Sequence, residues 1–300
     1  MTRVRLACAV LVAAAAAHPV RADVVVDRER SLYQNILVVD HNGRRCLQFT
    51  LKETPRNQSC KDLDAPERLV FPYAKMMLAS LLVLDDPKRI LVIGLGGASL
   101  PQALARLYPD VPIDIVEIDS AVVHVAETYF DFVPTSRMQV FVQDARVWGK
   151  RAASAATRYD LILLDAFNGD YIPEHMMTLE YLTETRALLT DRGVLAANTF
   201  ATSALYAHES ATYARAFGAI FNLKMPDNQN RIIIASRARL PARDALDAAA
   251  LRIGPRVAPL GINASDYPKR MDPRADWNKA ARVLTDQYSP ANLLREQPAD

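Results

Sequence analysis

From residue 89 onward, short apolar runs take turns with segments of helical length. The runs show no internal alternation with polar residues, and they are 89–93, 113–116, 138–142, 159–164, 193–197 and 231–235. Segments with the length and pattern of helices, 100–107 and 121–130, separate the first three runs. Strand–helix–strand units at this spacing build a parallel sheet, and continuously apolar strands need helices on both faces. The pattern therefore predicts an α/β fold with a doubly wound, mostly parallel, Rossmann-like sheet.

The region before residue 89 has a different pattern. Two β-rich runs, 33–39 and 45–49, flank His41-Asn42-Gly43, and Asn-Gly between such runs is typical of a β-hairpin. Residues 53–66 are polar and irregular, and 68–84 is an apolar segment of helical length that Asp85-Asp86-Pro87 ends. We expect a small β-hairpin domain plus a linking helix over 23–86, the Rossmann-like domain over 87–240, and a C-terminal extension over 241–300 that packs on it.

The first 22 residues are expected to be a secretory signal peptide. Arg3 and Arg5 precede the apolar run 6–17, and Val20-Arg21-Ala22 supplies small residues at the cleavage site. A run this short falls well below the ~20 residues that cross a bilayer, so no membrane span is expected after cleavage. The sequence predicts a cut after Ala22 and an exported, periplasmic or secreted protein. The alternatives are an uncleaved anchor or a misassigned start.

Cysteines, charge and histidines narrow the chemistry. Cleavage removes Cys8, and in an oxidising compartment Cys46 and Cys60 would pair as a disulfide, although they could equally be two unrelated small apolar side chains. The net charge is +2 with scattered Lys and Arg, which gives no case for nucleic acid or anionic lipid. The five histidines have no metal-ligand spacing, so no metal is expected.

The residues that follow the strands carry the candidate chemistry, because ligands bind beyond the carboxyl ends of strands in an open parallel sheet. The first strand is followed by a glycine loop, and the next three are followed by acids: Gly94, Gly96 and Gly97, then Glu117, Asp144 and Asp165. The loop lacks the lysine of a nucleoside-triphosphate-binding P-loop. An acid after the second strand suits ribose hydroxyls, and Asp144 is placed to accept from an adenine amino group. Taken singly, the loop could be an ordinary turn and each acid a helix cap.

In combination these segments resemble the spermidine synthases, the polyamine aminopropyltransferase family. The matching segments are RSLYQNI (30–36), ILVIGLGG (90–97), VEID (116–119), QDA (143–145) and LLDAFN (163–168). The resemblance implies an S-adenosylmethionine (AdoMet)-transferase sheet, decarboxylated AdoMet or AdoMet as co-substrate, an amine acceptor, no metal, and a homodimer formed through the N-terminal domain.

The resemblance also implies a role for each matching residue. Gln34 and the loop of Gly94, Gly96 and Gly97 would hold the thioether end of the donor, Glu117 its ribose, and Asp144 with Ala145 its adenine. Asp165 would orient the attacking amine and help to deprotonate it. Tyr73, Asn168 and Asp170 are candidates for the acceptor pocket.

Two departures from the family keep other functions open. The family carries an Asp in the glycine loop where this chain has Gly97-Ala98-Ser99, and Asn168 replaces a second acid after Asp165. The first hypothesis is therefore a divergent aminopropyltransferase. The alternatives are another AdoMet-dependent enzyme (a methyltransferase or an AdoMet lyase) and an exported polyamine- or nucleoside-binding protein without turnover. An NAD-dependent dehydrogenase competes only at the level of the fold.

Asp286, in a stretch that resembles a closing motif of this branch, would either approach the ligand cleft or cap a turn.

Overall fold

The structure is a computed structural model that describes residues 23–49, 56–167, 172–226 and 228–288. A small antiparallel sheet comes first, in the order β1-β2-β3-β4. Its strands are β1 (Val24–Arg30), β2 (Asn35–His41), β3 (Arg44–Phe49) and β4 (Arg56–Asp62). The predicted hairpin is β2–β3, whose turn places Asn42 and Gly43 at positive φ. The expectation that 53–66 is irregular was wrong, because β4 lies within it.

A large sheet of mixed direction fills the rest of the protein, in the order β10-β11-β9-β8-β5-β6-β7. Its strands are β5 (Ile90–Ile93), β6 (Ile113–Glu117), β7 (Met138–Val142), β8 (Tyr159–Leu164), β9 (Leu189–Phe200), β10 (Ile220–Lys224) and β11 (Asn230–Ser236). Strands β5 to β9 run parallel, while β10 and β11 pair antiparallel at the β9 edge. The predicted doubly wound, mostly parallel fold is confirmed. The late run at 231–235 proves to be an antiparallel strand, and β10 was not predicted.

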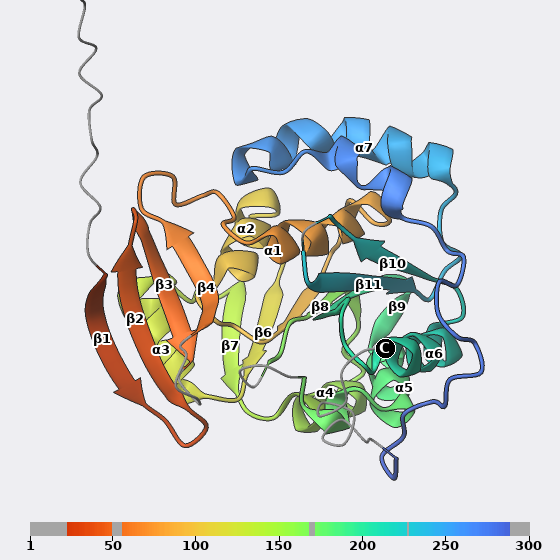
Figure 1. Cartoon of the computed structure of the whole chain (residues 1–300), viewed down its shortest axis with the longest axis horizontal. Helices are drawn as coiled ribbons and strands as arrows, with labels where there is room; N and C mark the ends of the chain where they lie inside the picture. Colours follow the sequence, from red (N-terminus) through yellow and green to blue (C-terminus); the bar gives the residue numbers. More distant parts are fainter. Residues whose placement is uncertain (1–22, 50–55, 168–171, 227, 289–300) are drawn as a thin grey trace, which may run out of the picture.

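Helices cover both faces of the large sheet (Figure 1). They are α1 (Pro72–Met77), α2 (Ser99–Leu107), α3 (Ser120–Tyr129), α4 (Ala145–Ser154), α5 (Leu179–Ala187), α6 (Tyr206–Phe217) and α7 (Arg243–Val257). Short 3-10 turns are η1 (Leu78–Leu82), η2 (Glu174–Met176), η3 (Ala258–Leu260), η4 (Ala264–Asp266) and η5 (Pro268–Arg270). The single linking helix expected over 68–84 is therefore only α1 followed by η1.

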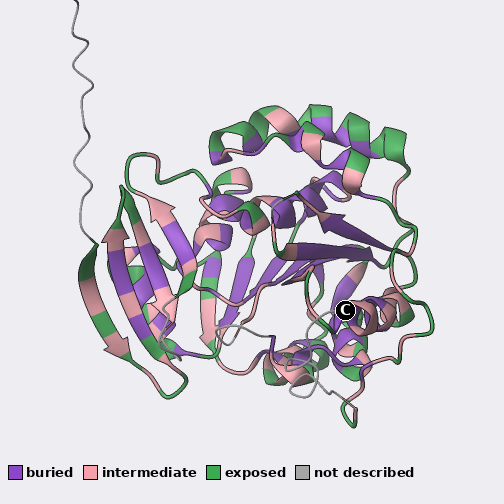
Figure 2. Cartoon of the chain, viewed as in Figure 1, coloured by how far each residue is buried: buried purple, intermediate pink, exposed green. Residues whose placement is uncertain are grey.

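Each central strand divides its side chains between two hydrophobic clusters. In β5, Ile90 and Val92 join the cluster beneath α1, α2, α3 and α7, whereas Leu91 and Ile93 join the cluster beneath α4, α5 and α6. All four are at most 3% exposed. Figure 2 shows the same strands buried along their length. This explains why the strands are continuously apolar, and it fixes the sheet edge on which the polar strand ends gather.

Strand order places the reversal of the sheet at β5. Successive strands β5, β6 and β7 are added towards one edge of the sheet, whereas β8 and β9 are added on the other side of β5. The carboxyl ends of β5 and β8, at Gly94 and Asp165, therefore flank the crevice where ligands bind in doubly wound sheets. Among the described helices, none is long and apolar enough to cross a membrane.

Candidate functional site

A cavity of about 430 Å³ opens at the carboxyl edge of the large sheet. Its lining includes residues from the ends of β5, β6, β7 and β8 together with residues of β4 and α1. Its volume lies within the range typical of small-molecule sites. The cavity brings together every site residue predicted within the described residues except Gly97, which lines a smaller neighbouring pocket. Asn168 and Asp170, predicted for the acceptor pocket, lie outside the described residues.

The glycine loop is shaped by close contact with β8. Gly94 has φ +94°, and a Cβ there would collide with the backbone oxygen of Asp165. Only glycine allows this approach, so the loop and the catalytic candidate are held next to each other. A Cβ at Gly97 would lie 2.7 Å from Ser59 Oγ of β4 and 2.9 Å from Cδ1 of Phe130. A side chain at Gly97, in the Gly97-Ala98-Ser99 stretch where the family carries its loop acid, would therefore require Ser59 or Phe130 to move.

Glu117, at the end of β6, contacts the glycine loop directly and lines the cavity beside it. Its carboxylate accepts hydrogen bonds from the backbone N–H of Leu95 at 2.9 Å and of Asp119 at 3.0 Å. Burial raises its pKa, and these two donors oppose that rise. Asp119 caps α3 through the backbone N–H of Ala121 at 2.9 Å. Glu117 is thus a fixed acceptor in the position that suits a ribose.

Asp144 is a helix cap, one of the two alternatives that the sequence left open, and it also lines the cavity. Its Oδ1 caps α4 by accepting from the backbone N–H of Arg146 at 3.0 Å and Val147 at 2.9 Å. The residue also lines the cavity together with Ala145, and its Oδ2 lies 3.3 Å from Nε2 of His175. The helix therefore fixes one oxygen, while the other is directed at the region beside His175.

Asp165 is held differently, by a side-chain amide. Nδ2 of Asn198 in β9 donates to its Oδ1 at 2.9 Å. Desolvation by the surrounding protein raises the pKa of Asp165 to about 6 although the residue keeps intermediate solvent exposure, while Asn198 and the Tyr73 hydroxyl act in the opposite direction. Tyr73 of α1 also donates to the carbonyl of Gln58 at 3.3 Å. A carboxyl with a pKa this close to neutrality can bind and release a proton under physiological conditions.

Gln34 lines the cavity as predicted, from the edge where β2 begins. Its Oε1 is buried and has no hydrogen-bond partner within the described part of the chain. Buried polar atoms are nearly always paired, so an unpaired acceptor in a residue that lines the cavity is consistent with a ligand that donates there.

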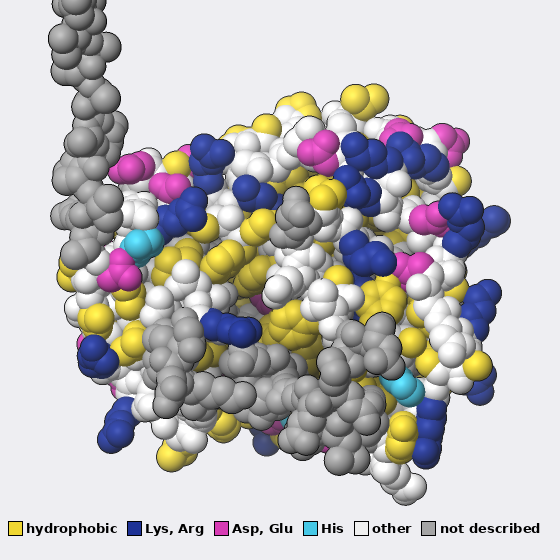
Figure 3. All heavy atoms as spheres, viewed as in Figure 1, with side chains coloured by type: hydrophobic (Ala, Val, Ile, Leu, Met, Phe, Trp, Pro, Cys, Tyr) yellow, Lys and Arg dark blue, Asp and Glu magenta, His cyan; other side chains and the backbone are white. Residues whose placement is uncertain are grey.

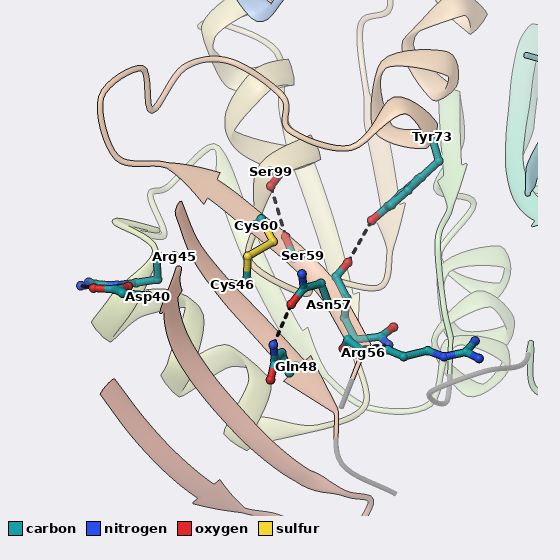
Figure 4. The surroundings of a disulfide bond; sticks show 11 residues. Asp40, Arg45, Cys46, Gln48, Arg56, Asn57, Ser59, Cys60, Tyr73 and Ser99 are labelled. Atoms are coloured by element: carbon teal, nitrogen blue, oxygen red, sulfur yellow. Dashed lines mark hydrogen bonds and ion pairs between the residues drawn. A yellow bond between two sulfur atoms is a disulfide. The ribbon is translucent and has the colours of Figure 1, made fainter. Parts of the chain in front are cut away.

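The N-terminal sheet lines the cavity with residues of β4. Cys46 and Cys60 face each other across β3 and β4 and form a disulfide, as predicted (Figure 4). Beside it, Ser59 Oγ lies 3.3 Å from Ser99 Oγ, at the start of α2. The disulfide thus fixes the strand that contacts the glycine loop.

Among the polar residues that line the cavity, sequence reasoning did not single out Asn198, Asn230 or His175. Asn198 directly follows the predicted strand 193–197, so inspecting the end of the fifth strand as well as the first four would have found it. His175 and Asn230 gave no comparable signal, because His175 lies in the 3-10 turn η2 and Asn230 begins the antiparallel strand β11.

Asp286 does not line the cavity. Arg146 donates to both of its oxygens, at 2.9 and 2.7 Å, and the Thr178 hydroxyl donates to Oδ1 at 2.7 Å. These donors lower the pKa of Asp286. Neither alternative, approach to the cleft or capping of a turn, describes it: Asp286 attaches the C-terminal stretch to α4 and α5.

In the part of the chain that the structure describes, neither the charges on the outer surface nor a metal-ligand cluster points to a second site. On the face in Figure 3, Lys and Arg are dispersed among Asp and Glu, and hydrophobic side chains gather near the middle. Across the described residues, no cluster of three His, Cys, Asp or Glu side chains could hold a metal ion.

Comparison with known proteins agrees with this geometry. The family model for the spermine/spermidine synthase domain matches residues 70–225. The chain is 50% identical over 273 residues to a polyamine aminopropyltransferase of Vibrio vulnificus, covering 90% of this chain and 91% of that one. It is also 32% identical over 141 residues to an eEF1A lysine and N-terminal methyltransferase of Bos taurus, covering 42% of this chain and 20% of that one.

Solved structures show the same fold. A probable spermidine synthase from Corynebacterium glutamicum superimposes with a TM-score of 0.64 at 18% identity, over 86% of this chain and 99% of that one. Human methyltransferase-like protein 13 in complex with SAH gives a TM-score of 0.57 at 23% identity, over 70% and 96%. From the residues matched and the identity to a full-length relative, the chain belongs to the spermine/spermidine synthase family.

Proposed function

We propose that this protein transfers an aminopropyl group from decarboxylated AdoMet to an amine acceptor of the polyamine type. The observation that carries the proposal is the convergence of Glu117, Asp144 and Asp165 on one cavity at the reversal of the sheet. The first two acids suit the ribose and adenine of an adenosine, and the third lies beside the glycine loop. The half-identical relative, a polyamine aminopropyltransferase, supports the same reaction.

The reaction is a displacement at carbon. The acceptor nitrogen attacks the carbon next to the sulfonium, a C–N bond forms, the C–S bond breaks, and its electron pair stays on sulfur in methylthioadenosine. The nitrogen must lose a proton, which Asp165 accepts. Gly94, Gly96 and Gln34 would position the thioether end, and Tyr73 would line the acceptor side.

The environment of Asp165 suits this role. With a pKa of about 6, the carboxyl is largely ionised in neutral solution and still basic enough to take a proton. Proton transfer of this kind contributes about 10²–10⁴-fold. Holding the two reactants in line contributes more, about 7–11 kcal/mol in well-oriented systems.

The test is to incubate the purified protein with decarboxylated AdoMet and putrescine, cadaverine or spermidine, and to measure methylthioadenosine by chromatography. We expect release with at least one amine. The control Glu117→Gln keeps the side-chain size but faces a backbone N–H with an amide N–H₂, so methylthioadenosine should bind more weakly. Neither release nor donor binding by the wild type would contradict the proposal. Tight binding without release would favour a binding protein.

A second candidate is an enzyme that uses AdoMet itself, such as a methyltransferase or a lyase. The observation that favours it is the crowding of Gly97 by Ser59 and Phe130, which disfavours an acidic side chain at the donor end of the site. A donor that retains its carboxylate is repelled less in such a site. Calorimetry that compares AdoMet with its decarboxylated form separates the two: preference for AdoMet would select this candidate.

We also propose that the protein is exported after cleavage behind Ala22, to the periplasm or the medium, and that it forms a homodimer. The Cys46–Cys60 disulfide supports an oxidising compartment. Cell fractionation with N-terminal sequencing tests the first point and sedimentation the second. An unprocessed N-terminus in the cytosolic fraction, or a monomer at micromolar concentration, would contradict them.

A further inference from the structure

Three asparagines in series lead to Asp165 from the segment that enters β11. Asn198 Nδ2 donates to Asp165 Oδ1 at 2.9 Å, and Asn230 Nδ2 donates to Asn198 Oδ1 at 3.0 Å. The backbone N–H of Asn230 donates in turn to Asn228 Oδ1 at 3.0 Å. Asn198 and Asn230 lie on neighbouring strands, β9 and β11, and both line the cavity.

The order of donors and acceptors in this series is forced. An ionised carboxylate only accepts, so Asn198 must present its N–H₂ to Asp165 and its oxygen to Asn230. That oxygen then requires a donor, which the N–H₂ of Asn230 supplies. Asn198 is 4% exposed, so water has little access to replace either bond.

We propose that Asn198 is a positioning residue for Asp165 and that Asn230 fixes the orientation of the Asn198 amide. The pair occupies Oδ1 of Asp165 and so fixes the orientation of the carboxylate that the incoming amine would meet. This inference rests on the proposed function for its consequence in catalysis, but not for the arrangement of the three side chains.

Few charged groups compete with this pair around Asp165. The titratable side chains that line the described cavity are Tyr33, Arg56, Tyr73, Glu117, Asp119, Asp144 and His175. Of these, the Tyr73 hydroxyl is the one that acts on Asp165, and it lowers the pKa together with Asn198. Without the Asn198 N–H₂, burial would act with less opposition and the pKa of Asp165 would rise.

The test uses Asn198→Leu, which keeps the side-chain size and removes the donor. The carboxyl carbon of Asp165 is followed by ¹³C NMR as a function of pH, and Asp165→Asn assigns the signal. We expect the titration midpoint to move up by about one pH unit. Because no substrate is present, this result is independent of whether the proposed reaction occurs.

A second readout separates positioning from general damage. The acidic limb of kcat/KM against pH should move up with the NMR midpoint, while methylthioadenosine affinity stays within about twofold, since the adenosine end is untouched. Asn230→Ala should move the midpoint in the same direction by less, and it carries the test should Asn198→Leu fail to fold. Asn198→Gln should partly restore the wild-type midpoint.

An unchanged midpoint in Asn198→Leu and Asn230→Ala would overturn the inference. So would an activity loss equal at every pH, because that is the result expected of a merely structural asparagine. Failure of the wild type to release methylthioadenosine would instead overturn the proposed function and leave the NMR result standing.

Discussion

Two carboxylates that line the same cavity, Asp144 and Asp165, are held in contrasting ways. Asp144 accepts two backbone N–H groups and so completes the first turn of α4. Asp165 accepts from a side-chain amide of β9, and its pKa is raised to about 6. One acid stabilises the fold that carries it, whereas the other is tolerated by the fold despite its burial.

The difference teaches how to separate structural from chemical roles in a site where successive strands end in an acid. Removing a helix cap should lower stability. Neutralising a carboxyl that burial disfavours should raise stability even as it removes activity, the usual compromise at a functional site. The two variants should therefore move stability in opposite directions.

The largest expected effect is on turnover in Asp165→Asn. The amide cannot accept the proton from the acceptor amine, so kcat should fall about 10²–10⁴-fold. Methylthioadenosine should still bind, because Asn198 can donate to the amide oxygen of the introduced side chain and the adenosine end is unchanged. Steady-state kinetics and calorimetry check both parts, and a loss of less than about tenfold would remove Asp165 from the base role.

The next effect is the pH dependence of stability. The pKa of Asp165 is raised to about 6, so the folded state binds the proton more tightly than the unfolded state does. The unfavourable contribution is then fully present above the folded-state pKa, and it fades as pH falls from about 6 towards the unfolded value of about 4. A displacement of about two pH units corresponds to roughly 2–3 kcal/mol.

Urea titrations of wild type and Asp165→Asn at several pH values measure this contribution. The variant should be more stable in mildly alkaline solution, and the gap should narrow as the solution is acidified through the titration range. Equal stability in alkaline solution would mean that the carboxyl is solvated well enough to carry no burial penalty.

The smallest effect is the loss of the α4 cap in Asp144→Ala. Its removal should lower the free energy of unfolding by about 1 kcal/mol. The matched control Asp144→Asn keeps a capping oxygen and should retain stability, while its altered hydrogen bonding weakens nucleoside binding. If Asp144→Ala and Asp144→Asn lower the free energy of unfolding equally, the helix cap does not explain the contribution of Asp144 to stability.

Much of this arrangement could be predicted from the sequence. The apolar runs 89–93, 113–116 and 159–164 are almost the observed strands β5, β6 and β8, because strands buried on both faces leave little choice of residue, and the run 138–142 coincides with the partly exposed edge strand β7. Once the strands are placed, the parallel topology brings Glu117, Asp144 and Asp165 to one edge. This is why the acids could be grouped from the sequence alone.

The parts that failed have physical reasons too. β4 (Arg56–Asp62) is polar because it is paired on one side only, in a small sheet that is partly exposed, so no apolar run reveals it. The Asn198–Asn230 pair depends on the register of β9 with β11, which two strands far apart in the chain adopt only in the folded sheet. The crowding at Gly97 comes partly from Ser59 in the N-terminal sheet, and the sequence does not show that this sheet packs against the loop.

That crowding constrains how this site could change. Ser59, on the strand tied down by the disulfide, and Phe130, after α3, occupy the volume that a side chain at position 97 would need. An acid introduced at position 97 into the present chain would collide with both side chains and distort the glycine loop. The same acid would be tolerated better if the residues at positions 59 and 130 had smaller side chains. We therefore expect the three positions to be epistatic, so that an acid at position 97 is tolerated better after a smaller side chain has been placed at position 59 or 130.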